Sequence, residues 1–211
     1  MRGWSRAAGL ALAVLALAAC DPASMGDAPT RTTVNVAGGP VGIAGPRGCC
    51  IDRDTLNVSE AGAFALLGDC GELGGGGGAL ARSPQGAALT ASISAGGLAG
   101  EGDDPASSLA ELAEYAQTRE GRALLGRSGR ADTVRILATR PQDDVLFVLV
   151  EDRGPQMIGG VSPRFWRAFL EVRDRMAVLS VLGFETGGLD EQTSLNLLAS
   201  FVASMQAANG A

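Results

Sequence analysis

The 211-residue sequence contains neither histidine nor lysine, and all 17 of its basic residues are arginines. Arginine stays protonated at any useful pH and is therefore a poor general base. Without histidine the chain has no Ser-His-Asp triad, no Cys-His dyad and no imidazole ligand for a metal. Without lysine it has no Schiff-base nucleophile and no Walker-type phosphate lysine. These absences exclude much of the common enzyme repertoire.

Residues 1–19 have the layout of a secretory signal. Arg2 and Arg6 make the start of the chain positive, and the uncharged run LALAVLALAA follows from Leu10 to Ala19. This run is shorter than the roughly 20 apolar residues that span a bilayer, so a stable transmembrane helix is the weaker interpretation. The pattern predicts export and removal of residues 1–19.

The residues around Cys20 resemble the lipobox of bacterial lipoproteins, because Leu17 and two alanines precede the cysteine. In that family a diacylglycerol is attached to the cysteine thiol, the signal is cut before the cysteine, and the new amino group is usually acylated. The resemblance implies lipid attachment at Cys20 and a membrane partner reached through that lipid. Two or three acyl chains anchor a protein durably, whereas one chain is marginal. An ordinary signal peptide with a cysteine near its end is the alternative.

The same resemblance places the mature chain on the periplasmic side of the cell envelope. Asp21 follows the lipid-carrying cysteine and resembles an inner-membrane retention signal of enterobacterial lipoproteins, but the choice between inner and outer membrane stays open. Residues 20–32 are rich in Asp, Pro, Ala, Ser and Gly and predict a flexible lipidated tether. Residues 33–211 predict a single α+β domain, with 95–104 as a candidate internal link.

The mature chain is acidic. Without Arg2 and Arg6, 15 arginines face 23 acidic residues, which gives a net charge of about −8. This charge argues against nucleic acid and against an anionic lipid surface as a partner. The partners that we expect are the membrane through the lipid on Cys20, and an envelope protein or a small ligand.

Three cysteines remain after Cys20, and an oxidising compartment predicts a disulfide among them. Neighbouring residues in a strand point to opposite faces, so only one of Cys49 and Cys50 can readily face Cys70. We expect a Cys50–Cys70 bond, because Cys50 leads directly into the loop that Cys70 closes. Cys49 could then be buried and inert, pair between molecules or exchange with Cys50. The three thiols lack CxxC spacing and a fourth ligand, so they do not predict a metal site.

The first half of the chain predicts strands and turns. Five consecutive glycines within 71–78 predict a flexible loop, because a phosphate-binding loop would need a following helix and a lysine or serine at a fixed offset. Short apolar runs bounded by turn residues predict strands at 33–36, 41–44, 63–67 and 88–94.

The second half predicts helices and two hairpins. Asp104-Pro105 and the motif SLAE predict a helix start, and an apolar stripe from Leu109 to Ala116 predicts its buried face. The order of elements predicts an α+β fold, with a mainly antiparallel sheet, helices packed on one face and a long C-terminal helix. The remaining expected elements are a helix at 119–125, a hairpin of 133–139 and 145–150 turning at 140–143, a hairpin of 165–172 and 176–182 turning at 173–175, and a helix from about 190 to 209.

The stretch AGPRGCCID, followed by AFALLGDC, resembles a pattern of exported proteins and lipoproteins of alphaproteobacteria. There an aromatic residue often stands where this sequence has Cys49, which supports the pairing of Cys50 with Cys70. The order of elements in the second half resembles, more loosely, that of PsbP- and Mog1-like domains. Neither resemblance implies an established activity.

The sequence therefore predicts a non-catalytic envelope lipoprotein that binds a protein or a small ligand, with no cofactor and no metal. Arg164, Phe165 and Trp166 are the candidate partner contact, because aromatic residues and arginine favour interfaces; a place for Trp166 in the core is the alternative. A carboxylate- or serine-dependent enzyme is the alternative function. Its candidate acid pairs are Asp103/Asp104, Asp143/Asp144 and Glu151/Asp152, but adjacent acids are ordinarily solvated turn residues, so we assign no catalytic residue.

Overall fold

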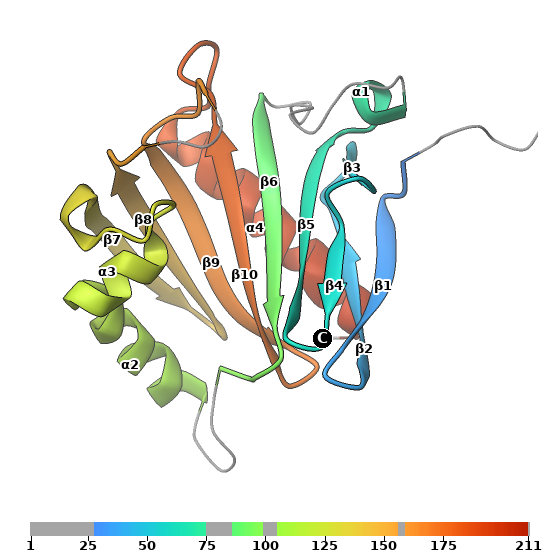
Figure 1. Cartoon of the computed structure of the whole chain (residues 1–211), viewed down its shortest axis with the longest axis horizontal. Coiled ribbons are helices and arrows are strands. Elements are labelled where there is room, and N and C mark those ends of the chain that lie inside the picture. The colour runs from blue at the N-terminus through green and yellow to red at the C-terminus, as the bar shows by residue number, and fades with distance from the viewer. Residues whose placement is uncertain (1–27, 75–85, 99–104, 156–158, 211) are drawn as a thin grey trace, which may run out of the picture.

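The computed structural model describes residues 28–74, 86–98, 105–155 and 159–210. Figure 1 shows a twisted sheet with helices on both sides. The strands are β1 (Arg31–Val36), β2 (Gly39–Ala44), β3 (Cys49–Ile51), β4 (Asn57–Ser59), β5 (Gly62–Asp69), β6 (Ala87–Ser94), β7 (Val134–Gln142), β8 (Val145–Asp152), β9 (Arg164–Val172) and β10 (Arg175–Gly183). The helices are α1 (Cys70–Gly74), α2 (Pro105–Gln117), α3 (Arg119–Leu125) and α4 (Glu191–Asn209), with a 3-10 turn at Ala131–Thr133.

An eight-stranded antiparallel sheet organises the fold. Its order is β3-β5-β6-β10-β9-β8-β7, and β4 pairs with β5 beside this path. Because β6 pairs with both β5 and β10, strands from both sides of residues 95–104 belong to the same sheet. Strands β1 and β2 form a separate hairpin. The antiparallel sheet and the 19-residue C-terminal helix confirm the α+β class.

Strand β8 is buried on both faces of the sheet, and its sequence VLFVLV is apolar throughout. Val145, Phe147 and Leu149 belong to the core beneath α4. The alternate residues Leu146, Val148 and Val150 belong to the core beneath α2 and α3. The helices were expected to pack on one face of the sheet, but they cover both faces. The reason is that a strand that is apolar on both sides needs cover on both. We call the face under α2 and α3 the front face and the face under α4 the back face (Figure 1).

Helix α4 covers the back face and is capped at both ends. The Asp190 side chain accepts a hydrogen bond of 2.9 Å from the Thr193 backbone N–H, and Gly210 ends the helix in the left-handed conformation. Leu198, Phe201 and Met205 of α4 are fully buried against the sheet, and their spacing is that of one helical face.

The last turn of α4 also holds the β1–β2 hairpin. The Asn209 side chain accepts a hydrogen bond of 2.9 Å from the Gly42 backbone N–H and donates one of 3.0 Å to the Gly42 carbonyl. A side chain at Gly42 would collide with the backbone of Ala208, because a Cβ there would lie 2.8 Å from the Ala208 carbonyl oxygen. Glycine therefore lets β2 lie directly against α4.

The structure gives the positions of the two expected hairpin turns. The β7–β8 hairpin turns at Asp143–Asp144, so the expected turn at 140–143 was wrong: Pro141 lies inside β7. A proline is tolerated there because β7 is an edge strand. The β9–β10 hairpin turns at Arg173–Asp174, within the expected segment, and both residues have positive φ.

The glycine-rich segment begins within α1, and residues 75–78 lie outside the described part of the chain.

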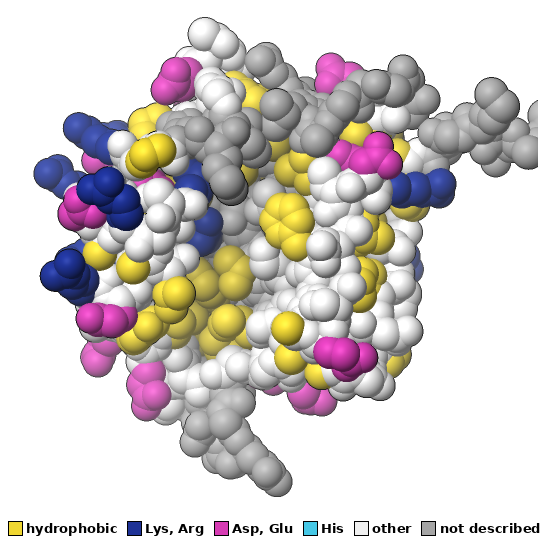
Figure 2. All heavy atoms as spheres, in the orientation of Figure 1, with side chains coloured by type: hydrophobic (Ala, Val, Ile, Leu, Met, Phe, Trp, Pro, Cys, Tyr) yellow, Lys and Arg dark blue, Asp and Glu magenta, His cyan; other side chains and the backbone are white. Residues whose placement is uncertain are grey.

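Within the described residues, no helix combines the length and the apolar character that a membrane crossing requires. Helices α2 and α3 cover only part of the front face, over the half of the sheet that contains β7 to β9 (Figure 1). The front face is hollowed beside these two helices (Figure 2).

Candidate functional site

A pocket of about 290 Å³ lies on the front face, where α2 and α3 meet β9 and β10. Its volume is just below the range of roughly 300–1,000 Å³ for small-molecule sites. Figure 2 shows a hollow beside the α2–α3 pair with hydrophobic side chains on its floor. The apolar and aromatic lining of the pocket consists of Leu112, Tyr115, Ala116, Leu124, Leu125, Phe169, Met176 and Val178.

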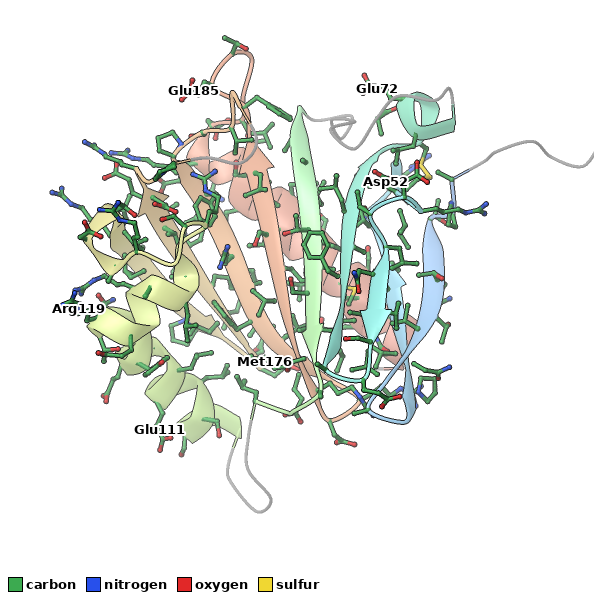
Figure 3. All side chains as sticks on the ribbon, viewed as in Figure 1. Asp52, Glu72, Glu111, Arg119, Met176 and Glu185 are labelled. Carbon is green, nitrogen blue, oxygen red and sulfur yellow. A yellow bond between two sulfur atoms is a disulfide. The ribbon has the colours of Figure 1, made fainter. Side chains whose placement is uncertain are left out.

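The wall of this front-face pocket depends on the close packing of α2 against α3. Thr118 caps α3 by accepting a hydrogen bond of 3.0 Å from the Gly121 backbone N–H, and its hydroxyl donates to the Tyr115 carbonyl at 2.7 Å. A Cβ at Gly121 would lie 1.9 Å from that same carbonyl oxygen. The two helices can therefore pack at this angle only with glycine at 121. Glu111 and Arg119 point away from the sheet (Figure 3). Met176 lies near the start of β10 and lines the pocket together with Leu112 of α2.

Two arginines lie over the ring of Phe165, and one of them, Arg167, also lines the pocket. Phe165, Arg167 and Phe169 share the front face because alternate residues of a strand point the same way. The Arg167 guanidinium carbon lies 5.2 Å from the centre of the Phe165 ring, and that of Arg127 lies 4.9 Å from it. Both distances are within the range of cation–π contacts. Arg167 also lines the pocket, so its guanidinium stands between the apolar cavity and Phe165.

Asp152, at the end of β8, is the carboxylate of this cluster. Its side chain is about 1 % exposed, and Oδ2 lies 3.8 Å from Arg127 Nε. It accepts hydrogen bonds from the backbone N–H groups of Arg127 (2.7 Å) and Gly154 (2.8 Å) and from the Thr133 hydroxyl (2.9 Å). Burial raises the pKa of Asp152, but these hydrogen bonds and the Arg127 charge together hold that pKa below its usual value.

Arg167 has no carboxylate partner among the described residues. Burial, and then the neighbouring Arg127 charge, lower the pKa of Arg167 to about 10, while Asp152 acts in the opposite direction. Burial likewise lowers the pKa of Arg127, against the opposing effect of Asp152. Both guanidinium groups are still protonated at neutral pH. The cluster therefore contains two positive charges and one negative charge.

Three enclosed polar atoms of this region have no hydrogen-bond partner. They are Arg127 Nε, Arg167 Nε and Ser128 Oγ, and they are the unpartnered buried side-chain atoms of the described residues. Buried polar groups ordinarily have a partner in the protein, in ordered water or in a ligand. The three atoms thus mark the Arg127–Arg167 region as polar, and of the three residues Arg167 lines the pocket. Arg127 and Arg167 are not among the residues predicted from the sequence. The signal for Arg167 is an arginine between Phe165 and Phe169 on one face of an apolar strand.

The expected contact residues Arg164, Phe165 and Trp166 do not form an exposed patch, although all three line a second cavity of about 210 Å³. Phe165 and Trp166 are 2 % and 1 % exposed and belong to the cores on opposite faces of the sheet, because they are neighbours in β9. The Trp166 indole N–H donates to the Glu191 carbonyl at 3.1 Å, on the α4 side. Arg164 is exposed and pairs with Glu151 at 3.1 Å. Of the three residues, the structure brings only Phe165 into the Arg127–Arg167 cluster.

The candidate acid pairs do not converge. Asp103 and Asp104 lie outside the described residues, and Asp143–Asp144 form the β7–β8 turn. Glu151 and Asp152 are neighbours in β8, and each is bound to different arginines: Glu151 to Arg153 and Arg164, Asp152 to Arg127. In the described part of the chain no group of three or more Cys, Asp or Glu residues is placed to hold a metal ion.

The disulfide lies at the β3 edge of the sheet, away from the pocket over β9 and β10. Cys50, in β3, is bonded to Cys70 at the start of α1, with an S–S distance of 2.06 Å; Figure 3 shows the bond near Asp52. Cys49 is free and buried in the core beneath α4. Burial, and secondarily the Asp69 charge, raise the pKa of the Cys49 thiol to about 11. A protonated, buried thiol favours the inert alternative for Cys49 over exchange or pairing between molecules. Cys20 lies outside the described residues.

No protein-family model, curated protein or solved structure matches the chain. The chemistry of the site therefore has to be inferred from its own geometry. The side chains lining the pocket are aliphatic and aromatic groups, the Met176 thioether, the Tyr115 phenol and the Arg167 guanidinium. Such a lining can hold an apolar molecule, and its guanidinium can pair with an anion.

Proposed function

We propose that this chain is an exported, lipid-anchored protein that binds a small ligand on its front face and catalyses no reaction. The observation that carries the proposal is the apolar front-face pocket with Arg167 in its lining. Apolar pockets with a few placed polar groups are the usual form of small-molecule sites. The resemblance of the residues around Cys20 to a lipobox supports the anchor, and the export signal before it supports the compartment.

The binding part of the proposal is tested by filling the pocket. Val178, on its floor, is half-buried in β10, and a Val178→Phe change puts a ring into the cavity without disfavouring a strand. We expect this variant to bind a neutral apolar probe, N-phenyl-1-naphthylamine, at least tenfold more weakly. Probe fluorescence is measured on the mature chain from residue 20, carrying Cys20→Ala so that no lipid competes.

Val58→Phe is the matched control, because Val58 is an exposed valine of β4 in the same sheet but outside the pocket. It makes the same chemical change and is expected to leave probe affinity within about twofold of the parent. Equal probe binding by the parent chain and the Val178→Phe variant would overturn the assignment of the pocket.

The anchor is tested on the full chain with a Cys20→Ala substitution. Because the thiol is the group that accepts the diacylglycerol in the lipoprotein family, the variant is expected to incorporate no radiolabelled palmitate and to remain as uncleaved or misplaced precursor. Palmitate labelling and membrane fractionation of producing cells measure both effects. Unchanged labelling of the Cys20→Ala variant would eliminate the lipobox interpretation.

A further inference from the structure

We propose that the ligand of the front-face pocket is an apolar carboxylic acid of medium chain length, whose carboxylate pairs with Arg167. The inference rests on the proposed binding function and adds the chemical class of the ligand. The chain of the acid would lie against α2 and α3, and the charged head would lie beside Arg167.

The cluster contains two guanidinium groups and one carboxylate, so one more negative charge would make it neutral. Arg127 and Arg167 both contact the Phe165 ring, and Asp152 is the single carboxylate that acts on them among the described residues. Its oxygens already accept three hydrogen bonds from other groups. A partly enclosed charge without a partner is costly, and a bound monoanion would remove that cost. A monocarboxylate supplies the one charge that is missing.

The geometry of the strands separates an apolar and a polar side of the site. Phe169 lies opposite Val178 in the neighbouring strand, and both line the pocket. Two residues further along, Arg167 lies opposite Ser180, which in turn lies opposite Thr90 of β6. Cross-strand partners share a face, so a polar row adjoins the apolar floor. A ligand that is apolar along one part and charged at one end matches this change.

The type of anionic group follows from the guanidinium itself. Its planar array of N–H donors matches the two oxygens of a carboxylate, with which arginine forms paired hydrogen bonds. The unpartnered Nε atoms of Arg127 and Arg167 and the Ser128 hydroxyl leave donors unused in the same region. The pocket volume of about 290 Å³ is small for a lipid with two chains, which favours a single chain of medium length.

Isothermal titration calorimetry with octanoate, 1-octanol and octyl phosphate tests the inference on the mature Cys20→Ala chain. We expect octanoate to bind at least tenfold more tightly than 1-octanol. Arg167→Gln should weaken octanoate binding at least tenfold and leave 1-octanol binding within about twofold, and Arg167→Lys should retain part of the octanoate affinity. Thermal unfolding of each variant checks that it is folded, and Val178→Phe should weaken both ligands together.

The possible failures are distinguishable. Equal binding of octanoate and 1-octanol, both lost in Val178→Phe, would overturn the carboxylate inference and keep the pocket. Tighter binding of octyl phosphate than of octanoate would also overturn it, in favour of a phosphate head. Absence of binding by every ligand and by the neutral probe would overturn the proposed function itself.

Discussion

Replacement of Asp152 by asparagine is expected to lower the free energy of unfolding by about 3–5 kcal/mol, the usual cost of removing one partner from a buried ion pair. The Asp152 carboxylate holds Arg127, Thr133 and Gly154 together. It is also the one carboxylate acting on Arg127 and Arg167 among the described residues. Its loss leaves two enclosed guanidinium groups without a counter-charge. Urea unfolding at neutral pH, followed by circular dichroism, measures the effect.

The difference between the parent and the Asp152→Asn variant should depend on pH in a definite direction. The pKa of Asp152 is held below its usual value in the folded protein, so its contribution to stability is complete above the unfolded pKa, near 4, and is lost as pH falls through the folded pKa. Asparagine does not titrate. The gap in unfolding free energy should therefore shrink as the pH is lowered below about 4, and a gap that widens would contradict this assignment.

Asp132→Asn is the matched control for this substitution. Asp132 forms a 2.8 Å ion pair with Arg130, but both side chains are more than half exposed. Exposed pairs of this kind contribute little to stability. The control variant is expected to unfold near the parent's midpoint at every pH, which separates the enclosed position of Asp152 from the mere loss of a charge.

Removal of the disulfide by a joint Cys50→Ala and Cys70→Ala substitution is expected to cost about 3 kcal/mol. The bond closes a loop of 20 residues. In the chain-entropy model, closing a loop of this size lowers the conformational entropy of the unfolded chain and stabilises the fold by about 3 kcal/mol. Urea unfolding of the variant should show an earlier midpoint than the parent. Because the bond lies at the β3 edge, far along the sheet order from β9 and β10, binding of the neutral probe by the folded variant should be unchanged.

The neighbouring cysteine supplies the control for this experiment. The parent Cys49 thiol is free and buried, and its pKa is raised to about 11. Replacing it by alanine leaves the Cys50–Cys70 bond in place. Without reductant, Cys49→Ala should keep the disulfide in mass spectra of the intact chain and shift the midpoint much less than the joint substitution. Loss of the disulfide in Cys49→Ala would mean that Cys49 provides the bond to Cys70.

The strands and helices were largely predictable because local patterns determine them. The Asp190 cap and the apolar spacing of Leu198, Phe201 and Met205 are visible in the sequence, and they bound and orient α4. The run VLFVLV of β8 also carried a signal for cover on both faces, since a half-exposed strand would alternate with polar residues. The position of the β7–β8 turn was harder to predict, because Pro141 is a turn former that an edge strand also accepts.

The candidate site was less predictable, since it depends on contacts between distant elements. Alternation along β9 could have separated Phe165 from Trp166, and it places Arg167 between two phenylalanines on one face. Nothing local indicates that Arg127, after α3, comes to the same phenylalanine ring. The close approach of α3 to α2 at Gly121, which forms the wall of the pocket, is likewise a property of the folded chain.

The hydrogen bonds between Asn209 and Gly42 join segments 167 residues apart. In the export route that we propose, the β1–β2 hairpin crosses the membrane before α4. Val41 and Ile43 of the hairpin belong to the core that α4 completes, so they lack their cover until α4 emerges. The domain would therefore complete its assembly only after α4 has crossed, and the segments before α4 would stay incompletely folded during their passage.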